Sequence, residues 1–171
     1  LEVEDLLVLK NNKGTEDNRV RHMDYGVQFN KLMYERLMSG GNITLFSPHD
    51  VPGLYDAFFA DQDEFKRLYE QAERKTSIRK KVISATELFS AFMQERKDTG
   101  RIYLQNVDHA NEHSSFKTDL APIKQSNLCC EIDLPTKPLN DINDPNGEIA
   151  LCTLSAVNWG SFKNPEDMEK A

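Results

Sequence analysis

Stretches with helical periodicity alternate with short β-rich runs along this chain. The longest periodic stretch covers residues 80–97, where apolar side chains recur on one broad face and Gly100 follows the expected end. Shorter helices are predicted over residues 1–10, over the later part of 25–38, from Pro52-Gly53 through residue 59, and over 65–72. A short strand is predicted at the start of 25–38, and residues 43–46 form a brief apolar run before Ser47-Pro48. The first helix is expected to end at a turn formed by residues 11–14.

The sequence becomes richer in β-forming residues after the long helix. Residues 101–107, 126–134 and 148–157 are short and separated by Asn, Asp, Gly and Pro, which indicates strands or extended segments. The connection between the last two is too short for a crossover helix, so we expect them to run antiparallel. Alternating helices and strands predict an α/β architecture, and 171 residues are typical of one domain.

Charge and hydropathy exclude two classes of partner. The net charge of −7 is spread along the chain, and the one basic run is Arg79-Lys80-Lys81, so nucleic acid is not an expected partner. Apolar runs fall well short of the ~20 residues that a membrane helix needs. Three cysteines without CxxC spacing favour a reducing, cytoplasmic setting in which the thiols stay free. Leu1 stands inside an amphipathic pattern, and the helix start predicted at Asn164-Pro165-Glu166-Asp167 is followed by only a few residues, so both ends are expected to be arbitrary cuts.

The segment around Cys129 offers the clearest candidate chemistry. An extended chain with a period of two would place Asn127, Cys129 and Glu131 on one side and Leu128, Cys130 and Ile132 on the other. An amide, a thiol and a carboxylate on one face could hold a hydroxylated substrate, with Glu131 as a general base. The pattern alone is more often a half-buried strand with a solvated polar face, so both interpretations stay open.

Cys152 lies on a second apolar segment, 148–157, that could face the first. By itself such a cysteine is more often a small buried hydrophobic residue than a redox group. Antiparallel pairing of the two segments would favour the functional interpretation, because two thiols would then lie near one carboxylate.

The histidines make a weaker case for metal binding. His109 and His113 have the spacing of a helical metal pair, but polar neighbours favour a solvated loop, and we expect no metal site. His22 and His49 stand next to Asp24 and Asp50, which local turn hydrogen bonds explain.

Several strings of this sequence resemble one enzyme family, the large subunits of class I ribonucleotide reductases. The strings cover nearly the whole chain, and they are Gln125-Ser126-Asn127-Leu128-Cys129 with Glu131, Leu134-Pro135-Thr136-Lys137-Pro138, Gly147-Glu148-Ile149-Ala150-Leu151-Cys152 with Leu154-Ser155-Ala156, Asn18-Arg19-Val20-Arg21-His22-Met23-Asp24-Tyr25, Leu45-Phe46-Ser47-Pro48-His49-Asp50-Val51-Pro52-Gly53, and Gln94-Glu95-Arg96 with Gly100-Arg101-Ile102-Tyr103.

This resemblance implies that residues 1–171 form part of a ten-stranded α/β catalytic barrel, incomplete in this chain, with the finger loop and following strand at about 123–158. It implies a thiyl radical on Cys129 that abstracts the 3′ hydrogen of a ribonucleoside diphosphate. Asn127 and Glu131 would hydrogen-bond the ribose hydroxyls, with Glu131 as base, and Cys152 would be one of two thiols that reduce the 2′ position. The family usually has an apolar residue at position 130, so we interpret Cys130 as its replacement.

The resemblance also implies components outside this chain. The partner thiol of Cys152 would lie upstream of Leu1 and the radical-relay tyrosines downstream of Ala171. A small subunit with a metal and tyrosyl radical, thioredoxin or glutaredoxin as reductant, and ATP or deoxynucleotide effectors would complete the enzyme, while no cofactor is expected within this chain. The isolated chain is therefore expected to be inactive unless complemented. The alternative is a non-catalytic remnant that binds other reductase chains.

Overall fold

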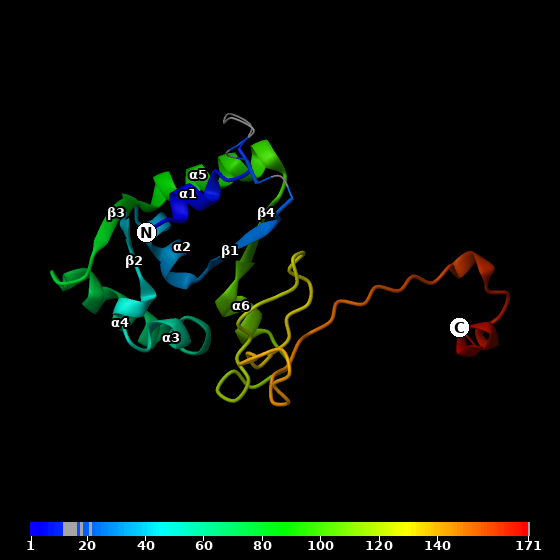
Figure 1. Ribbon diagram of the computed structural model, residues 1–171. Coiled ribbons are helices and arrows are strands. Elements are labelled where there is room, and N and C mark those ends of the chain that lie inside the picture. The colour runs from blue at the N-terminus through cyan, green and yellow to red at the C-terminus, as the bar shows by residue number, and fades with distance from the viewer. Residues whose placement is uncertain (12–16, 18, 21, 171) are drawn as a thin grey trace.

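The computed structural model describes residues 1–11, 17, 19–20 and 22–170, which form a mixed body of helices and strands followed by an extended C-terminal segment (Figure 1). Its α-helices are α1 (Val3–Leu7), α2 (Lys31–Met38), α3 (Leu54–Ala60), α4 (Gln62–Arg74), α5 (Ala85–Thr99) and α6 (Val107–Glu112). Its strands are β1 (Tyr25–Phe29), β2 (Asn42–Phe46), β3 (Lys80–Ser84) and β4 (Ile102–Asn106). Short 3-10 helices cover Pro48–Asp50, Trp159–Ser161 and Pro165–Lys170.

The strands form two separate two-stranded sheets within the described residues. β1 pairs in parallel with β4, so that Tyr25 lies opposite Ile102 and Gln28 opposite Gln105. β2 pairs with β3 in the antiparallel direction. The α/β class is thus confirmed, and the described residues include no closed barrel, as expected of an incomplete one.

Two hydrophobic clusters hold this body together. The first lies between β1, β4 and α5, and its buried members are Leu7, Phe29, Met33, Ile43, Ala85, Leu88, Phe92 and Ile102. The second lies around α3 and α4, and its buried members are Leu32, Val51, Leu54, Ala57, Phe65, Tyr69, Ala72 and Ile78. Figure 1 shows α1 and α5 side by side along the strands, with α3 and α4 beyond β2. The first cluster fixes β1 and β4, which hold the site described below.

Side chains that accept backbone N–H groups define where several helices begin. Asn30, Asp61 and Ser84 accept from the amides of Met33, Glu64 and Glu87 at the starts of α2, α4 and α5. Such caps satisfy amides that have no partner inside the helix. The predicted helices in 25–38, 53–59 and 65–72 are confirmed, as is the strand that precedes the first of them.

The predicted helix over 80–97 is wrong in its first turn. Residues Lys80–Ser84 form strand β3, and the helix starts only at Ala85. The cause is the pairing with β2, which offers Val82 and Ile83 an extended partner, and the cap at Ser84, which sets the later start. The helix predicted over 1–10 is also shorter, Val3–Leu7, and residues 12–14 of the predicted turn lie outside the described residues.

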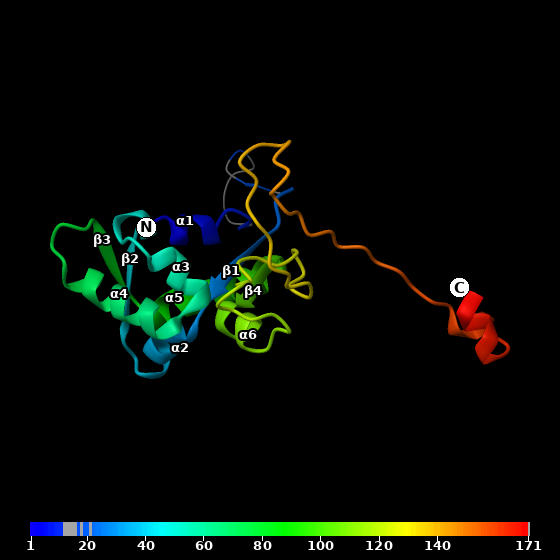
Figure 2. The same ribbon diagram turned by 90° about the horizontal axis from the view of Figure 1, so that it is seen from below.

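The extended segments predicted after residue 125 do not form strands. Residues 126–134 contain one isolated bridge, between Ser126 and Asp133, and a turn lies between its two ends. Residues 148–157 have no regular secondary structure and are exposed, with Ile149 and Leu154 among them. The expected antiparallel pairing between the two segments is therefore absent from the described residues. Both views show the chain from about residue 150 running away from the body (Figures 1 and 2).

Among the described residues, no helix is both long enough and apolar enough to cross a membrane.

Candidate functional site

The segment around Cys129 folds back on itself as a short loop. At its base the Asn127 amide donates to the Ile132 carbonyl at 3.2 Å, and the Cys130 amide donates back to the Asn127 carbonyl at 3.1 Å. Cys130 has a φ of 65°, in the left-handed region that lets the chain reverse here. Cys129 lies exposed at this turn. The two-sided extended face expected from sequence is wrong, because a left-handed residue interrupts it.

The Asn127 side chain organises the loop from within. Its Oδ1 accepts the amides of Glu131 at 3.1 Å and Ile132 at 3.0 Å. Its Nδ2 donates to Glu131 Oε1 at 2.5 Å and lies 3.6 Å from Cys152 Sγ. Asn127 thus contacts both Glu131 and Cys152, although the turn rather than strand pleating brings Glu131 to it.

Cys152 lies beside the same carboxylate. Its Sγ is 3.9 Å from Glu131 Oε1, within the range of a weak hydrogen bond to sulfur. Residues 148–152 and 125–127 face each other across a cavity of about 270 Å³, although no ladder joins them. Amide, carboxylate and thiol therefore meet at one point, with Glu131 and Cys152 exposed. Such a group can hold hydroxyls, accept a proton and supply a thiol hydrogen.

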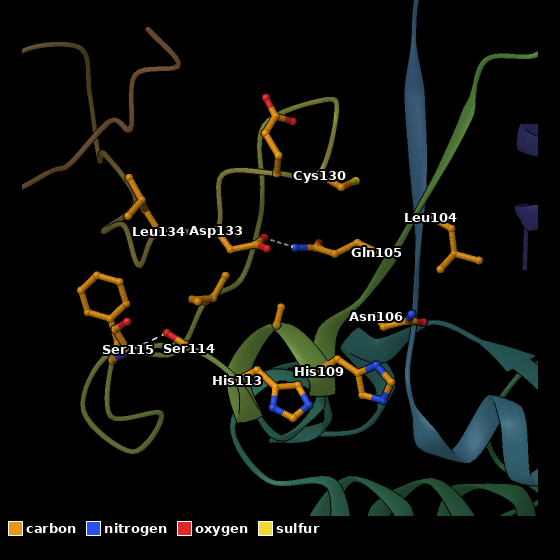
Figure 3. A pocket seen from close by; sticks show the side chains of 14 residues that line it. Leu104, Gln105, Asn106, His109, His113, Ser114, Ser115, Cys130, Asp133 and Leu134 are labelled. Atoms are coloured by element: carbon orange, nitrogen blue, oxygen red, sulfur yellow. Dashed lines mark hydrogen bonds between the residues drawn. The ribbon is translucent and has the colours of Figure 1, made fainter. Parts of the chain in front are cut away.

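Cys130 lines other cavities than Cys152 does. It lines a cavity of about 610 Å³ together with Gln105, Asp133 and two histidines (Figure 3). In this view the hydrogen bond between Asp133 and Gln105 lies between Cys130 and the histidine pair. Cys130 also lines a cavity of about 580 Å³ beside β1, which includes Asn127 and Gln28.

The histidine pair lies on a helix, contrary to the loop expected from sequence. His109 belongs to α6 and His113 caps it, with ring centroids 5.9 Å apart. The first residue of α6, Val107, is buried directly after β4 and anchors the helix to the body, although the polar composition of the segment favoured a loop. Within the described part of the chain, no group of three or more His, Cys, Asp and Glu side chains could hold a metal ion.

Two basic side chains beside β1 lie next to the carboxylate of Asp24. A hydrogen bond from Lys10 holds the pKa of Asp24 below its usual range, and the Arg101 guanidinium lies 3.8 Å from the same carboxylate. Burial raises the pKa of Tyr25, whose hydroxyl donates to the Leu7 carbonyl at 3.0 Å. These contacts hold the start of β1 against α1.

Sequence reasoning missed three residues that hold the loop in place, Gln28, Gln105 and Asn111. Gln28 and Gln105 are each the fourth residue of a strand and each follows an apolar residue, Val27 or Leu104. This shared position becomes a signal only once the pairing of β1 with β4 is known. Asn111 carried no comparable signal, because the helix that presents it was not predicted.

The comparisons with known proteins agree on one family. A family model described as the ribonucleotide reductase barrel domain matches residues 1–171. The chain is 68% identical over 164 residues to the ribonucleoside-diphosphate reductase subunit alpha of Haemophilus influenzae, a match that covers 96% of this chain and 22% of that protein. It is 72% identical over 141 residues to ribonucleoside-diphosphate reductase 1 subunit alpha of Escherichia coli, covering 82% of this chain and 18% of that protein.

A viral relative is similar as well. The chain is 60% identical over 163 residues to the ribonucleoside-diphosphate reductase subunit alpha of Enterobacteria phage T4, covering 95% of this chain and 21% of that protein. The chain therefore spans about a fifth of the length of the curated relatives it matches.

Proposed function

Because this chain belongs to the ribonucleotide reductase barrel domain family, we propose that it supplies part of the catalytic barrel of a ribonucleoside-diphosphate reductase large subunit. The supporting observation is the contact of Asn127 with both Glu131 and Cys152, with the turn that carries Cys129 between the first two. Residues 1–171 would act as one partial barrel domain, with the finger loop and following segment at about 123–158. Completion by the remaining large-subunit segments is part of the proposal, since the chain spans about a fifth of its relatives.

The proposed chemistry assigns one role to each residue. Cys129, as a thiyl radical, takes the 3′ hydrogen of the ribose as S–H and returns it at the end. Glu131 accepts the proton of the 3′ hydroxyl, and Asn127 donates to a ribose hydroxyl. Cys152 and a thiol of another segment give two hydrogens and become a disulfide, while the 2′ hydroxyl leaves as water. The 3.9 Å between Cys152 Sγ and Glu131 Oε1 favours this shared site.

The proposal requires partners of stated kinds. A small subunit with a metal and tyrosyl radical would generate the radical, and thioredoxin or glutaredoxin would reduce the disulfide after each turnover. ATP and deoxynucleotide effectors would bind segments outside this chain. A cytoplasmic setting, indicated by three thiols without CxxC spacing, stays a prediction.

Three cysteine variants test this function in a subunit rebuilt from this chain, the missing large-subunit segments and a radical-generating small subunit. Cys129→Ser should abolish reduction, because an O–H bond is too strong to form a useful radical relay. Cys152→Ser should still allow nucleotide-dependent loss of the small-subunit radical but give no product from reductant-driven turnover. Product formation and radical loss are both measured, and full turnover by Cys129→Ser would refute the assignment.

Cys130→Leu is the matched control, because it changes a neighbouring thiol outside the Asn127, Glu131 and Cys152 contacts. It should leave turnover nearly unchanged. If the rebuilt wild-type subunit binds the other chains but forms no deoxynucleotide, the chain is instead a non-catalytic interaction module.

A further inference from the structure

Two glutamines face each other near the C-terminal end of the parallel strand pair. Gln28 of β1 and Gln105 of β4 are directly opposite in register, and Gln28 Nε2 donates to Gln105 Oε1 at 2.8 Å. Gln105 is 8% exposed and Gln28 is half-buried. The backbones of neighbouring strands are already joined by hydrogen bonds, so this side-chain pairing is a contact beyond those of the sheet.

The same two amides bind both arms of the loop that carries Cys129. Gln28 Nε2 also donates to the carbonyl of Lys124, before the turn, at 2.8 Å. Gln105 Nε2 donates to Asp133 Oδ1, after the turn, at 2.7 Å (Figure 3). A continuous chain of hydrogen bonds therefore runs from one arm of the loop, through both strands, to the other arm.

A third anchor holds the loop farther upstream. Asn111 of α6 is 6% exposed, its Nδ2 donates to the carbonyl of Ile123 at 2.9 Å, and its Oδ1 accepts the Ile123 amide at 2.8 Å. Ile123 is itself buried. This contact fixes where the first arm leaves the body, but the second arm is joined to the strands through Gln105.

We propose that Gln28 and Gln105 are positioning residues that set the place of the Cys129 turn and of Glu131 relative to the strands. This inference rests on the proposed function for its catalytic meaning, although the positioning itself does not. Neither glutamine contacts Cys129 or Glu131 in the hydrogen bonds described above, so each would act through Lys124 or Asp133. The two strands would then fix the position of the site through the two arms of the loop.

Position 105 requires an amide side chain, because it both accepts and donates a hydrogen bond. Gln105 must accept from Gln28 through its oxygen and donate to the Asp133 carboxylate through its nitrogen. A glutamate at position 105 keeps the shape and the acceptor but loses the donor, and it brings two carboxylates together. Changing Asp133 to asparagine as well would restore a donor and acceptor pair with its direction reversed.

The test measures amide hydrogen exchange in the rebuilt subunit, which requires assembly but no turnover. The reporters are the amides of Glu131 and Ile132, which Asn127 binds, and the Ile123 amide is an internal control because Asn111 holds it. Gln105→Glu should lower protection of the two reporters about tenfold, the effect of losing one hydrogen bond to a charged group. Protection of Ile123 should stay unchanged. The double variant Gln105→Glu/Asp133→Asn should recover most of the loss.

Gln94→Glu is the matched control for the charge change. Gln94 also donates to an aspartate, Asp98, at 2.8 Å, but both residues lie on α5, away from the Gln28, Gln105 and Asn111 contacts that hold the loop. It should leave the reporters unaffected. Should Gln105→Glu fail to fold, Asp133→Ala removes the same contact from a less buried position and should give the same loss of reporter protection.

Turnover supplies the second measurement. Gln105→Glu should lower kcat about tenfold with KM little changed, and the double variant should regain it. Reporter protection within twofold of wild type in both Gln105→Glu and Asp133→Ala, or failure of the double variant to recover, overturns the positioning role. Absence of turnover in wild type refutes the proposed function instead, and the exchange data still decide the role of the glutamines.

Discussion

The side chains of the first region, up to Ile123, and those of the second region, beyond it, pack and form hydrogen bonds in different ways. Before Ile123, apolar side chains pack into two clusters and polar ones bridge distant elements, as Tyr69 does to Thr44. Beyond it, most hydrogen bonds close local turns, such as Asp144 to Asn140 and Asn146, and apolar side chains such as Leu151 and Leu154 are exposed. The candidate site lies in the second region but is held by side chains of the first. The hydrophobic clusters of the first region therefore determine the geometry of the site, although no residue of the site belongs to them.

The sharpest test of this contrast removes one large side chain from each region. Phe92 is 1% exposed and packs against the ring of Phe29 at a centroid distance of 5.2 Å, whereas Leu154 is 84% exposed. Phe92→Ala should lower the free energy of unfolding by about 3 to 5 kcal/mol, through lost burial and a cavity. Leu154→Ala should change it by less than about 0.5 kcal/mol. Urea denaturation followed by circular dichroism measures both, and equal effects would erase the distinction between the regions.

Asn111 stands at the boundary and tests whether the first region holds the second. Asn111→Ala leaves both the amide and the carbonyl of buried Ile123 without their side-chain partner. We expect a loss of about 2 to 3 kcal/mol in unfolding free energy. Exchange at the Ile123 amide should rise at the same time. A stable variant whose Ile123 amide stays protected would mean that the loop is held without Asn111.

The buried hydroxyl of Tyr69 makes the stability of the first region depend on pH. Its hydroxyl donates to the Thr44 carbonyl at 2.8 Å and accepts the Thr44 amide at 2.7 Å, and burial raises the pKa of Tyr69 from 10.0 to about 12. Because the pKa is higher in the folded chain than in the unfolded one, this stability is complete below pH 10 and is lost as pH rises from 10 to 12.

Tyr69→Phe should therefore cost about 1 to 2 kcal/mol near neutral pH and flatten the alkaline decline. Unfolding midpoints at pH 8, 10 and 11 measure both effects. An unchanged alkaline slope in the variant would place the titrating group elsewhere.

The smallest expected effect is in the second region, at Cys130. Its φ of 65° is one that glycine adopts freely, so Cys130→Gly should relieve up to about 1 kcal/mol of local strain. Cys130→Leu keeps the same backbone cost and serves as its comparison. Exchange protection across 126–133 should rise modestly for the glycine variant. A drop in protection would show that the cysteine side chain itself stabilises the turn.

In the first region the periodic burial of helix faces allowed the secondary structure to be predicted from sequence. The second region lacks such burial, and strands were predicted there wrongly. Helices α2, α4 and α5 bury one face each, so their spacing was visible, and the error at Lys80–Ser84 came from a strand that runs directly into a helix. The β-forming residues at 126–134 and 148–157 indicated strands that the described chain does not pair. Propensity describes what a segment accepts, whereas a strand also needs a partner.

The residues of the candidate site were named from sequence, but their arrangement was not. Asn127, Glu131 and Cys152 do meet, yet through a turn at a left-handed Cys130 that no propensity indicated. Their catalytic roles stay proposals. The glutamines that hold the loop escaped notice because a single glutamine in a strand has no meaning until the strand paired with it is known.

The register between β1 and β4 has a further consequence for how the chain reaches its native state. Gln28 and Gln105 are separated by 77 positions, so parallel pairing of their strands carries the loop-closure entropy of the whole intervening chain. The turn with Cys129 is joined to these strands through its second arm, because Gln105 donates to Asp133. Because β1 and β4 both precede Cys129 in the chain, their pairing can be complete before the segment with Cys129 is synthesised, and the loop then closes onto strands that are already in register.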